Sequence, residues 1–553
     1  MRNRLSFLFI LMTGSATFLL GAYLVSDLTK DDIASAEKLI GLRFNDAKRD
    51  SMLDGLMNNL KSYERLREVP LANSVMPALL FNPIPPGFSF DTRKSSFTPS
   101  PAPKVKRPAN LEDVAFWSVR ELGELIRTRQ VTSEELTRMY LDRLKKYGPA
   151  LQCVVTLTES LAVAQARRAD RELKVGKYRG PLHGIPYGAK DLLATKGYKT
   201  TWGSVAYKDQ VIDEDATVIK RLEAAGAVLV AKLTLGELAW GDVWFGGMTR
   251  NPWNYKQGSS GSSAGSASAT AAGLVGFAIG SETWGSIVSP STRCGTTGLR
   301  PTYGRISRKG AMALSWSMDK LGPICRTVED CALVFQAIYG PDGQDPTVYN
   351  LPFRYDHKVD LRKLRIGYVK MDFDSARNNK ENNDAVLAVL QKLGAKLIPM
   401  ELPKLPFTSL SFLLSAEAAA AFDDLTRSGR DSLLVRQIKN AWPNVFRAAR
   451  FVPAVEYIQA NRVRTLVIEE MQKILKDIDV YVVPSFSDNL LLTNLTGHPC
   501  VVVPNGFNKE GSPTSITFGG KLFDEGTILA VAKSYQDATD WHKKHPTLLT
   551  HVE

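Results

Sequence analysis

Two serines and one lysine in this chain have the residue types and surroundings that acyl-transfer chemistry needs. Ser262 and Ser286 lie in a stretch of small residues, because the run 258–269 contains only glycine, serine and alanine and a second small cluster includes Gly285. A serine hydroxyl becomes a nucleophile only when a base removes its proton. A lysine amine can be that base only when it is uncharged, which requires burial among apolar groups. Lys190 meets this requirement, because apolar residues flank it in GIPYGAKDLL.

The stretch around the two serines resembles the signature segment of the amidase signature family, whose members hydrolyse or transfer carboxamides. The resemblance continues in the right order from about Asp113 to Trp541. Several separate motifs carry it: GIPYGAKDLL around Lys190, TRNPWN at Thr249–Asn254, GLRPTYGRIS at Gly298–Ser307, and SMDKLGPICRTVEDCALVF at Ser317–Phe335. The resemblance implies an α/β fold, a single large domain in which helices flank a central mixed β-sheet.

The resemblance also implies a role for each of the three residues. The family uses a Ser–Ser–Lys triad in which the first serine follows a cis peptide bond. Ser286 matches the nucleophile, Ser262 the bridging serine that relays a proton, and Lys190 the base. Backbone N–H groups are then expected to stabilise the oxyanion of the tetrahedral intermediate. These groups belong to the turn Thr283, Trp284, Gly285 and Ser286.

Large apolar side chains near the motifs are the candidates for substrate contacts. We expect the pocket to include Trp202, Met248, Trp284 and Trp316. Two departures from the family pattern bear on the substrate, since Trp284 stands where the family usually has glycine and Val288 where it usually has arginine. A backbone N–H survives either change. The departures therefore concern the choice of substrate more than the mechanism.

Three functions are open at this point. The first is an amidase that hydrolyses a carboxylic amide to an acid and an amine or ammonia through a Ser-linked acyl-enzyme. The second is a glutamine-dependent amidotransferase A-type subunit that supplies ammonia to a partner. The short chain between VVPSF (482–486) and TGHPCVVVP (496–504) argues against this role, because relatives that use glutamine are longer there. The third is an inactive amidase-like binding protein, which the filled triad positions disfavour.

Ser263 is a rival nucleophile, because Gly261-x-Ser263-x-Gly265 satisfies the GxSxG pattern of esterases. That pattern requires a hydrophobic strand immediately before it. The preceding residues, NPWNYKQGSS, are not such a strand. The esterase interpretation is therefore the weaker one.

Helical and strand-like segments alternate along the chain, which favours the α/β class. Two capping boxes, Ser118 with Glu121 and Thr132 with Glu135, predict helix starts. Helix–strand units are expected at Asp213–Leu233 and Asn383–Met400, further helices at Leu161–Leu173, Ser409–Leu425 and Val452–Asp477, and strands at 152–157, 480–484 and 499–504.

The chain divides into five expected regions. Arg2 and Arg4 precede an uncharged run, so residues 1–26 are predicted to be a signal peptide or an uncleaved membrane anchor. The remainder would then lie outside the cytoplasm, in the periplasm, in the cell envelope or secreted. The other expected regions are a helical extension at 27–81, a proline-rich strap at 82–108, the amidase signature domain at 109–545 and a C-terminal tail at 546–553.

Composition excludes some classes of function. The net charge of +13 is scattered, with no block of five like charges, so no nucleic-acid partner is expected. The five cysteines show no CxxC pair and are expected to be mostly buried thiols, with one disulfide left open. The six histidines form no HExxH motif, so neither a metal nor another cofactor is expected. The expected partner is a small-molecule amide, with membrane attachment through residues 5–26 and a homodimer left open.

Overall fold

The computed structural model describes residues 28–375 and 378–551. The chain forms two compact units, Met1–Leu71 and Ala72–Glu553. The predicted signal or anchor at residues 1–26 lies outside the described residues. Among the residues that are described, no helix combines the length and the apolar character needed to cross a bilayer.

The described part of the first unit is a pair of helices, α1 (Lys30–Ile40) and α2 (Asp46–Arg67), as the sequence predicts. Thr29 opens α1 with a reciprocal capping box. The two helices are joined by an ion pair, in which Arg49 Nη2 lies 2.7 Å from Glu37 Oε2. The unit ends at Leu71, ten residues before the expected limit of the extension.

The second unit is built on a mixed sheet of eleven strands among the described residues. In spatial order the strands are β14 (Leu397–Met400), β13 (Ile366–Val369), β15 (Val480–Pro484), β17 (Pro513–Gly520), β16 (Cys500–Phe507), β10 (Thr297–Arg300), β11 (Lys320–Cys325), β9 (Phe277–Glu282), β3 (Pro186–Lys190), β4 (Val228–Leu233) and β2 (Val154–Leu157). β3 runs parallel to both β4 and β9. From β9 to β15 the neighbouring strands are antiparallel. The predicted mixed sheet is thus confirmed.

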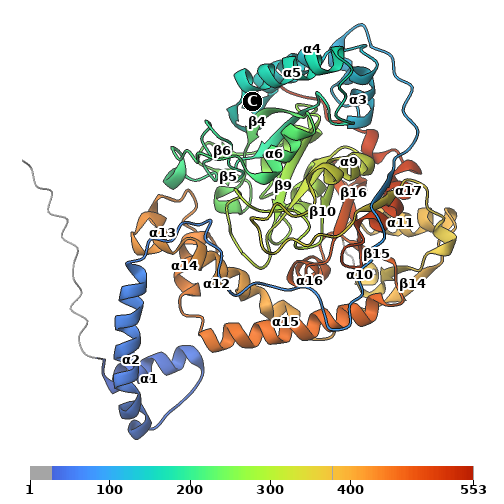
Figure 1. Ribbon diagram of the computed structural model, residues 1–553. Coiled ribbons are helices and arrows are strands. Elements are labelled where there is room, and N and C mark those ends of the chain that lie inside the picture. Colours follow the sequence, from blue (N-terminus) through green and yellow to red (C-terminus); the bar gives the residue numbers. More distant parts are fainter. Residues whose placement is uncertain (1–27, 376–377, 552–553) are drawn as a thin grey trace, which may run out of the picture. The chain divides into compact units, whose positions relative to one another are not determined.

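Helices surround this sheet, and Figure 1 shows α4, α5 and α15 outside the central strands β9, β10 and β16. The helices of the second unit are α3 (Val119–Arg127), α4 (Ser133–Leu151), α5 (Glu159–Lys174), α6 (Thr217–Ala224), α7 (Ala264–Ala271), α8 (Val288–Cys294), α9 (Val328–Ile338), α10 (Lys370–Ser375), α11 (Lys380–Lys392), α12 (Phe412–Ala421), α13 (Asp423–Arg427), α14 (Trp442–Ala449), α15 (Ala454–Leu475), α16 (Asp488–Thr496) and α17 (Glu525–Asp537). Both predicted capping boxes are present at the starts of α3 and α4.

One predicted helix is divided in the structure. The segment Ser409–Leu425 begins in a 3₁₀ turn, continues as α12 and restarts as α13. The chain bends at Phe422, whose backbone is not helical (φ −121°, ψ 28°) and whose ring is buried against Phe446. Packing of this ring therefore overrides the local helix propensity of an alanine-rich segment.

The proline-rich strap, residues 82–108, is held to the second unit along its length. Its short strand β1 (Ser96–Thr98) pairs in parallel with β12 (Arg354–Asp356). Farther on, Arg120 Nη2 donates to the carbonyl oxygens of Ser100 and Pro101 at 2.5 and 2.8 Å. The strap is therefore an ordered, extended part of this unit. Two further small sheets pair β5 (Val243–Trp244) with β6 (Gly247–Met248) and β7 (Arg250–Asn251) with β8 (Asn254–Gly258).

All five cysteines are buried as free thiols, in agreement with the interpretation of the sequence. Burial raises the pKa of the Cys153 and Cys500 thiols to about 12. Each thiol therefore packs as a small apolar side chain.

The stacked pair of Phe277 and Tyr187 joins β9 to β3, with ring centroids 5.2 Å apart. Phe277→Ala should lower the free energy of unfolding by about 3–5 kcal/mol, because it leaves a cavity between the strands that position the lysine. Urea titration followed by circular dichroism measures the change. Phe486→Ala is the matched control, since 63% of Phe486 is exposed. Equal shifts for the two variants would contradict this assignment of the core.

Candidate active site

Lys190 is the last residue of β3, an interior strand that is third from the β2 edge of the sheet. β3 is placed between β4 and β9, and all five of its residues are buried. Lys190 itself is 0% exposed. Burial lowers the pKa of its amine to about 7, although the carboxylates of Asp319 and Glu282 act in the opposite direction. A substantial fraction of the amine is therefore uncharged at neutral pH, as the sequence analysis requires.

Three serine hydroxyls surround this amine. Lys190 Nζ lies 2.8 Å from Ser262 Oγ, 3.0 Å from Ser263 Oγ and 2.9 Å from Ser281 Oγ. Ser263 Oγ donates to the Ser281 carbonyl at 3.0 Å and accepts from the Ser281 N–H at 3.1 Å. The rival nucleophile Ser263 is thus already committed to β9, whereas Ser262 is not bound in this way.

The peptide bond between Gly261 and Ser262 is cis, which confirms the expectation drawn from the resemblance. Only glycine fits at position 261, because a Cβ there would lie 1.7 Å from the Gly241 carbonyl oxygen. Close packing also explains the small residues that follow. A Cβ on Gly265, in the first turn of α7, would lie 2.4 Å from the Cys153 carbonyl oxygen. The glycine–serine run is therefore a tightly packed segment and not a linker.

Ser286 lies at the end of a turn that joins β9 to α8, and it is 8% exposed. Gly285 has φ +87°, a left-handed conformation that glycine adopts without strain. The turn meets the serine-rich segment through the Ser263 N–H, which donates to the Ser286 carbonyl at 3.2 Å. Within the described chain, no hydrogen bond joins Ser262 Oγ to Ser286 Oγ. The structure thus brings Lys190 and Ser262 together and places Ser286 on the adjoining segment.

The carboxylate of Glu282 binds the backbone N–H groups that follow Ser286. Its Oε2 accepts from the N–H groups of Ile287 and Val288 at 2.8 and 3.0 Å, and its Oε1 accepts from Arg300 Nη1 at 2.7 Å and Asn494 Nδ2 at 2.8 Å. Glu282 and Arg300 are both 0% exposed. Burial alone would raise the pKa of Glu282, but Arg300 and the N–H donors lower it to about 2. A buried charge pair therefore fixes the backbone on both sides of Ser286.

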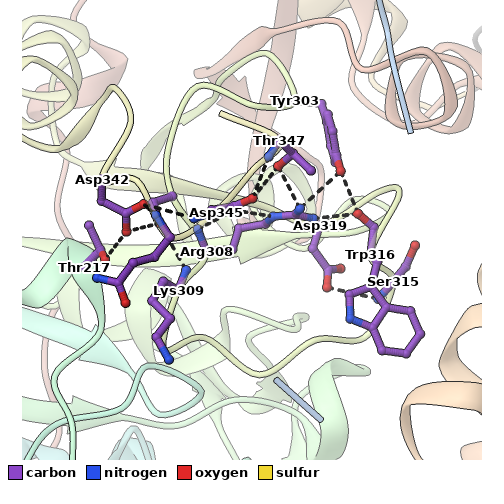
Figure 2. A network of polar contacts seen from close by, with 12 residues as sticks. Thr217, Tyr303, Arg308, Lys309, Ser315, Trp316, Asp319, Asp342, Asp345 and Thr347 are labelled. Atoms are coloured by element: carbon purple, nitrogen blue, oxygen red, sulfur yellow. Dashed lines mark hydrogen bonds and ion pairs between the residues drawn. The ribbon is translucent and has the colours of Figure 1, made fainter. Parts of the chain in front are cut away.

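Asp319 supports the other end of the same turn. Its Oδ1 accepts from Thr283 Oγ1 at 2.5 Å, and its Oδ2 accepts from the N–H groups of Leu314 and Ser315 at 2.8 and 3.0 Å. Figure 2 shows Asp319 beside Ser315 and Trp316 in this network. Asp319 thereby connects the predicted oxyanion turn to the loop that precedes β11.

A cavity of about 260 Å³ opens beside these groups, with Ser281, Thr283 and Asp319 in its lining. Trp316, one of the four residues predicted to contact substrate, is part of the lining. The other three residues proposed for substrate contacts are placed differently among the described residues. Trp202 is buried against Tyr207 and Phe422, Met248 lies in the short strand β6, and Trp284 is 44% exposed. Their contact with substrate stays a prediction.

The sequence analysis did not identify Ser281, Glu282 and Asp319 as parts of the site. A signal was present for two of them, since Glu282 is the first charged residue after a long uncharged stretch and Asp319 lies within SMDKLGP. His498 is buried, and its ring Nδ1 shares a hydrogen bond with Thr496 Oγ1 at 2.8 Å. Burial lowers the pKa of His498 to about 3.

Comparison with known proteins finds amidases and an amidotransferase subunit among the chains that are similar to this one. A family model described as Amidase matches residues 135–491. The A subunit of glutamyl-tRNA(Gln) amidotransferase from Geobacillus kaustophilus is 36% identical over 481 residues, which cover 78% of this chain and 99% of the relative. Native peptide amidase from Stenotrophomonas maltophilia superimposes with a TM-score of 0.69 at 30% identity, covering 77% of this chain and 97% of that chain. An amidase family protein from Bacillus anthracis gives a TM-score of 0.70 at 28% identity, covering 80% and 96% of the two chains.

Removing the charge of Glu282 tests how the turn is held. Glu282→Gln should lower the free energy of unfolding by about 3–5 kcal/mol, because it leaves Arg300 buried without a counter-charge. Chemical denaturation at pH 7 measures the change. Glu159→Gln is the control, because Glu159 pairs with Lys145 at the surface, where both side chains are about half exposed. A Glu282→Gln protein as stable as this control would refute the structural role of the pair.

Proposed function

This chain belongs to the amidase signature family, and we propose that it is an amidase that hydrolyses a carboxylic amide to an acid and an amine or ammonia. The observation that carries the proposal is the buried amine of Lys190 within 2.8 Å of Ser262 Oγ. A buried lysine whose pKa is close to 7 is suited to proton transfer at neutral pH. An inactive binding protein would have no need of this arrangement.

In the proposed mechanism, neutral Lys190 takes the proton of Ser262, and Ser262 takes the proton of Ser286 as Ser286 Oγ attacks the amide carbonyl. The Ser262–Ser286 contact would form when substrate is bound, because catalytic hydrogen bonds are often long in unliganded enzymes. The N–H groups of residues 283–286 would stabilise the oxyanion. The proton returns through Ser262 to the leaving amine as the carbon–nitrogen bond breaks. Water then attacks the acyl-enzyme by the same proton path and releases the acid.

The cavity supports an apolar substrate. Its lining is dominated by apolar side chains, among them Met76, Leu192, Met312, Leu314, Trp316 and Leu321. The two cations in the lining already have acidic partners, since Arg308 pairs with Asp345 at 3.1 Å and Lys309 with Glu214 at 3.0 Å. A free amino acid such as glutamine would need unengaged partners for its carboxylate and its ammonium group. The cavity therefore favours an amide with an apolar group over glutamine.

The second candidate is an amidotransferase A-type subunit, like the Geobacillus kaustophilus relative. Such a subunit would need glutamine and a partner protein. The segment that the sequence analysis found short holds only the helix α16 between β15 and β16. Together with the apolar cavity, this makes the hydrolytic amidase the better-supported proposal.

Substitution of the proposed nucleophile and base tests the mechanism. Ser286→Ala and Lys190→Met should each lower kcat/KM by about 10⁴-fold or more, because each removes a group on which the others depend. Release of amine or ammonia from a panel of aryl and aliphatic amides is the measurement. Ser428→Ala changes an exposed serine that is not part of the cavity lining, and it should leave the rate unchanged. If glutamine is the one amide that releases ammonia, and if it does so only when a partner protein is added, the result would favour the amidotransferase instead.

The pH profile tests the protonation state of Lys190. Its amine must be neutral to act, so kcat/KM should rise about tenfold per pH unit below pH 7 and level off above it. Glu237 is another group whose pKa burial raises to about 7, and it lies two residues before the cavity residue Ala239. Glu237→Gln should therefore keep the rising limb if Lys190 is responsible. A rate that is flat from pH 5 to 9 would exclude a lysine base.

A further inference from the structure

We propose that residues 73–76, which precede the part of the chain matched by the family model, form one wall of the cavity beside Ser281 and Thr283 and set the size of the apolar group that this cavity admits. This inference rests on the proposed amidase function. Asn73, Ser74 and Met76 line the same cavity as Ser281 and Thr283. The family match begins only at residue 135. The wall is therefore supplied by a segment more than fifty residues upstream of the matched part.

Asn73 fixes this segment to Ala313, another residue of the cavity lining. Its Oδ1 accepts from the Ala313 N–H at 2.7 Å, and its Nδ2 donates to the Ala313 carbonyl at 2.8 Å. The same Nδ2 lies 3.3 Å from the carbonyl oxygen of Ala421, the last residue of α12. One side chain thus satisfies both backbone groups of a lining residue, which a side chain lying there by chance would not do.

The chain that follows is fixed to the same loop a second time. The Phe81 ring packs edge-on against Tyr303, with centroids 5.0 Å apart, and the Arg464 guanidinium lies 3.6 Å from the Phe81 ring centre. Tyr303 Oη donates to the Trp316 carbonyl at 2.8 Å, and Arg308 Nη1 donates to it at 2.7 Å. Figure 2 shows these two donors converging on Trp316. The upstream segment and the lining loop therefore form one structure, anchored at Asn73 and at Phe81.

Met76 is the residue of this wall that can contact substrate directly. It is partly buried and lines the cavity, whereas its neighbours Val75 and Leu79 are 52% and 75% exposed and do not belong to the lining. Methionine is flexible and fills apolar space adaptably. The volume at position 76 thus limits the apolar group, and Asn73 is a positioning residue that keeps Met76 in place.

The test uses two alkyl fluorophosphonates, one with a methyl and one with an octyl chain, on the full-length protein. Ser286 Oγ attacks phosphorus, a P–O bond forms, the P–F bond breaks, fluoride leaves and the serine proton passes to Lys190. The ratio of the octyl to the methyl labelling rate measures chain-length selectivity and is insensitive to a general loss of active protein. Met76→Ala should raise this ratio about tenfold, and Met76→Trp should lower it by a similar factor.

Two further variants distinguish an effect of the cavity wall on chain-length selectivity from a general loss of stability. Asn73→Ala should shift the ratio in the same direction as Met76→Ala, because it releases the segment. Val75→Ala, a change of similar size on the same segment but facing solvent, should leave the ratio at the wild-type value. Melting temperatures of all variants are recorded, and Met76→Leu, which keeps the volume, should restore the wild-type ratio.

The outcomes distinguish the two proposals. If neither probe labels Ser286 in the wild-type protein, the amidase proposal itself fails. If both probes label it and the ratio is the same in the Met76 and Val75 variants, the amidase proposal stands and the wall is disproved. If Val75→Ala changes the ratio as much as Met76→Ala does, the proposal that residues 73–76 select the substrate would also be wrong.

Discussion

The structure depends on keeping one amine out of water. Lys190 ends a strand that has parallel neighbours on both sides, and in the described structure its amine makes hydrogen bonds to the hydroxyls of Ser262, Ser263 and Ser281. Burial favours the neutral amine, and the hydroxyls satisfy its hydrogen-bonding capacity without stabilising its charge as a carboxylate would. The glycines and serines around it are a consequence of this demand, because larger side chains would separate α7 from the strands that shield the amine.

A second set of residues, Glu282, Arg300 and Asp319, fixes the backbone turn beside this buried amine. Glu282 and Arg300 pair within the sheet and hold the N–H groups that follow Ser286, while Asp319 holds Thr283 at the start of the same turn. Both carboxylates also lie close enough to oppose the loss of charge on Lys190. The site thus balances two requirements, since the acidic groups that shape the turn must not be near enough to keep the lysine protonated.

The resemblance to the amidase signature family predicts the fold class, the cis bond before Ser262 and the proximity of Lys190 to that serine, because short motifs of this chain match those of the family. It does not predict the partners that lie far along the chain. Glu282 binds Asn494, and Asn73 binds Ala313, and no local pattern reports such pairs. The break at Phe422 was missed for the same reason, since a distant ring, Phe446, determines it. The four predicted substrate contacts rest on side-chain type alone, and the type of a residue does not determine the direction in which its side chain points.

The attachment of residues 73–76 to Ala313 has a consequence for how this protein can change over evolutionary time. On the proposed function, the groups that break the amide bond lie on one stretch of the gene, whereas residues 73–76 of the cavity wall are encoded upstream of it. A mutation in the upstream stretch can alter preference while the reaction chemistry is inherited intact. A new substrate preference can then arise in a few mutations, because each intermediate variant keeps its catalytic groups.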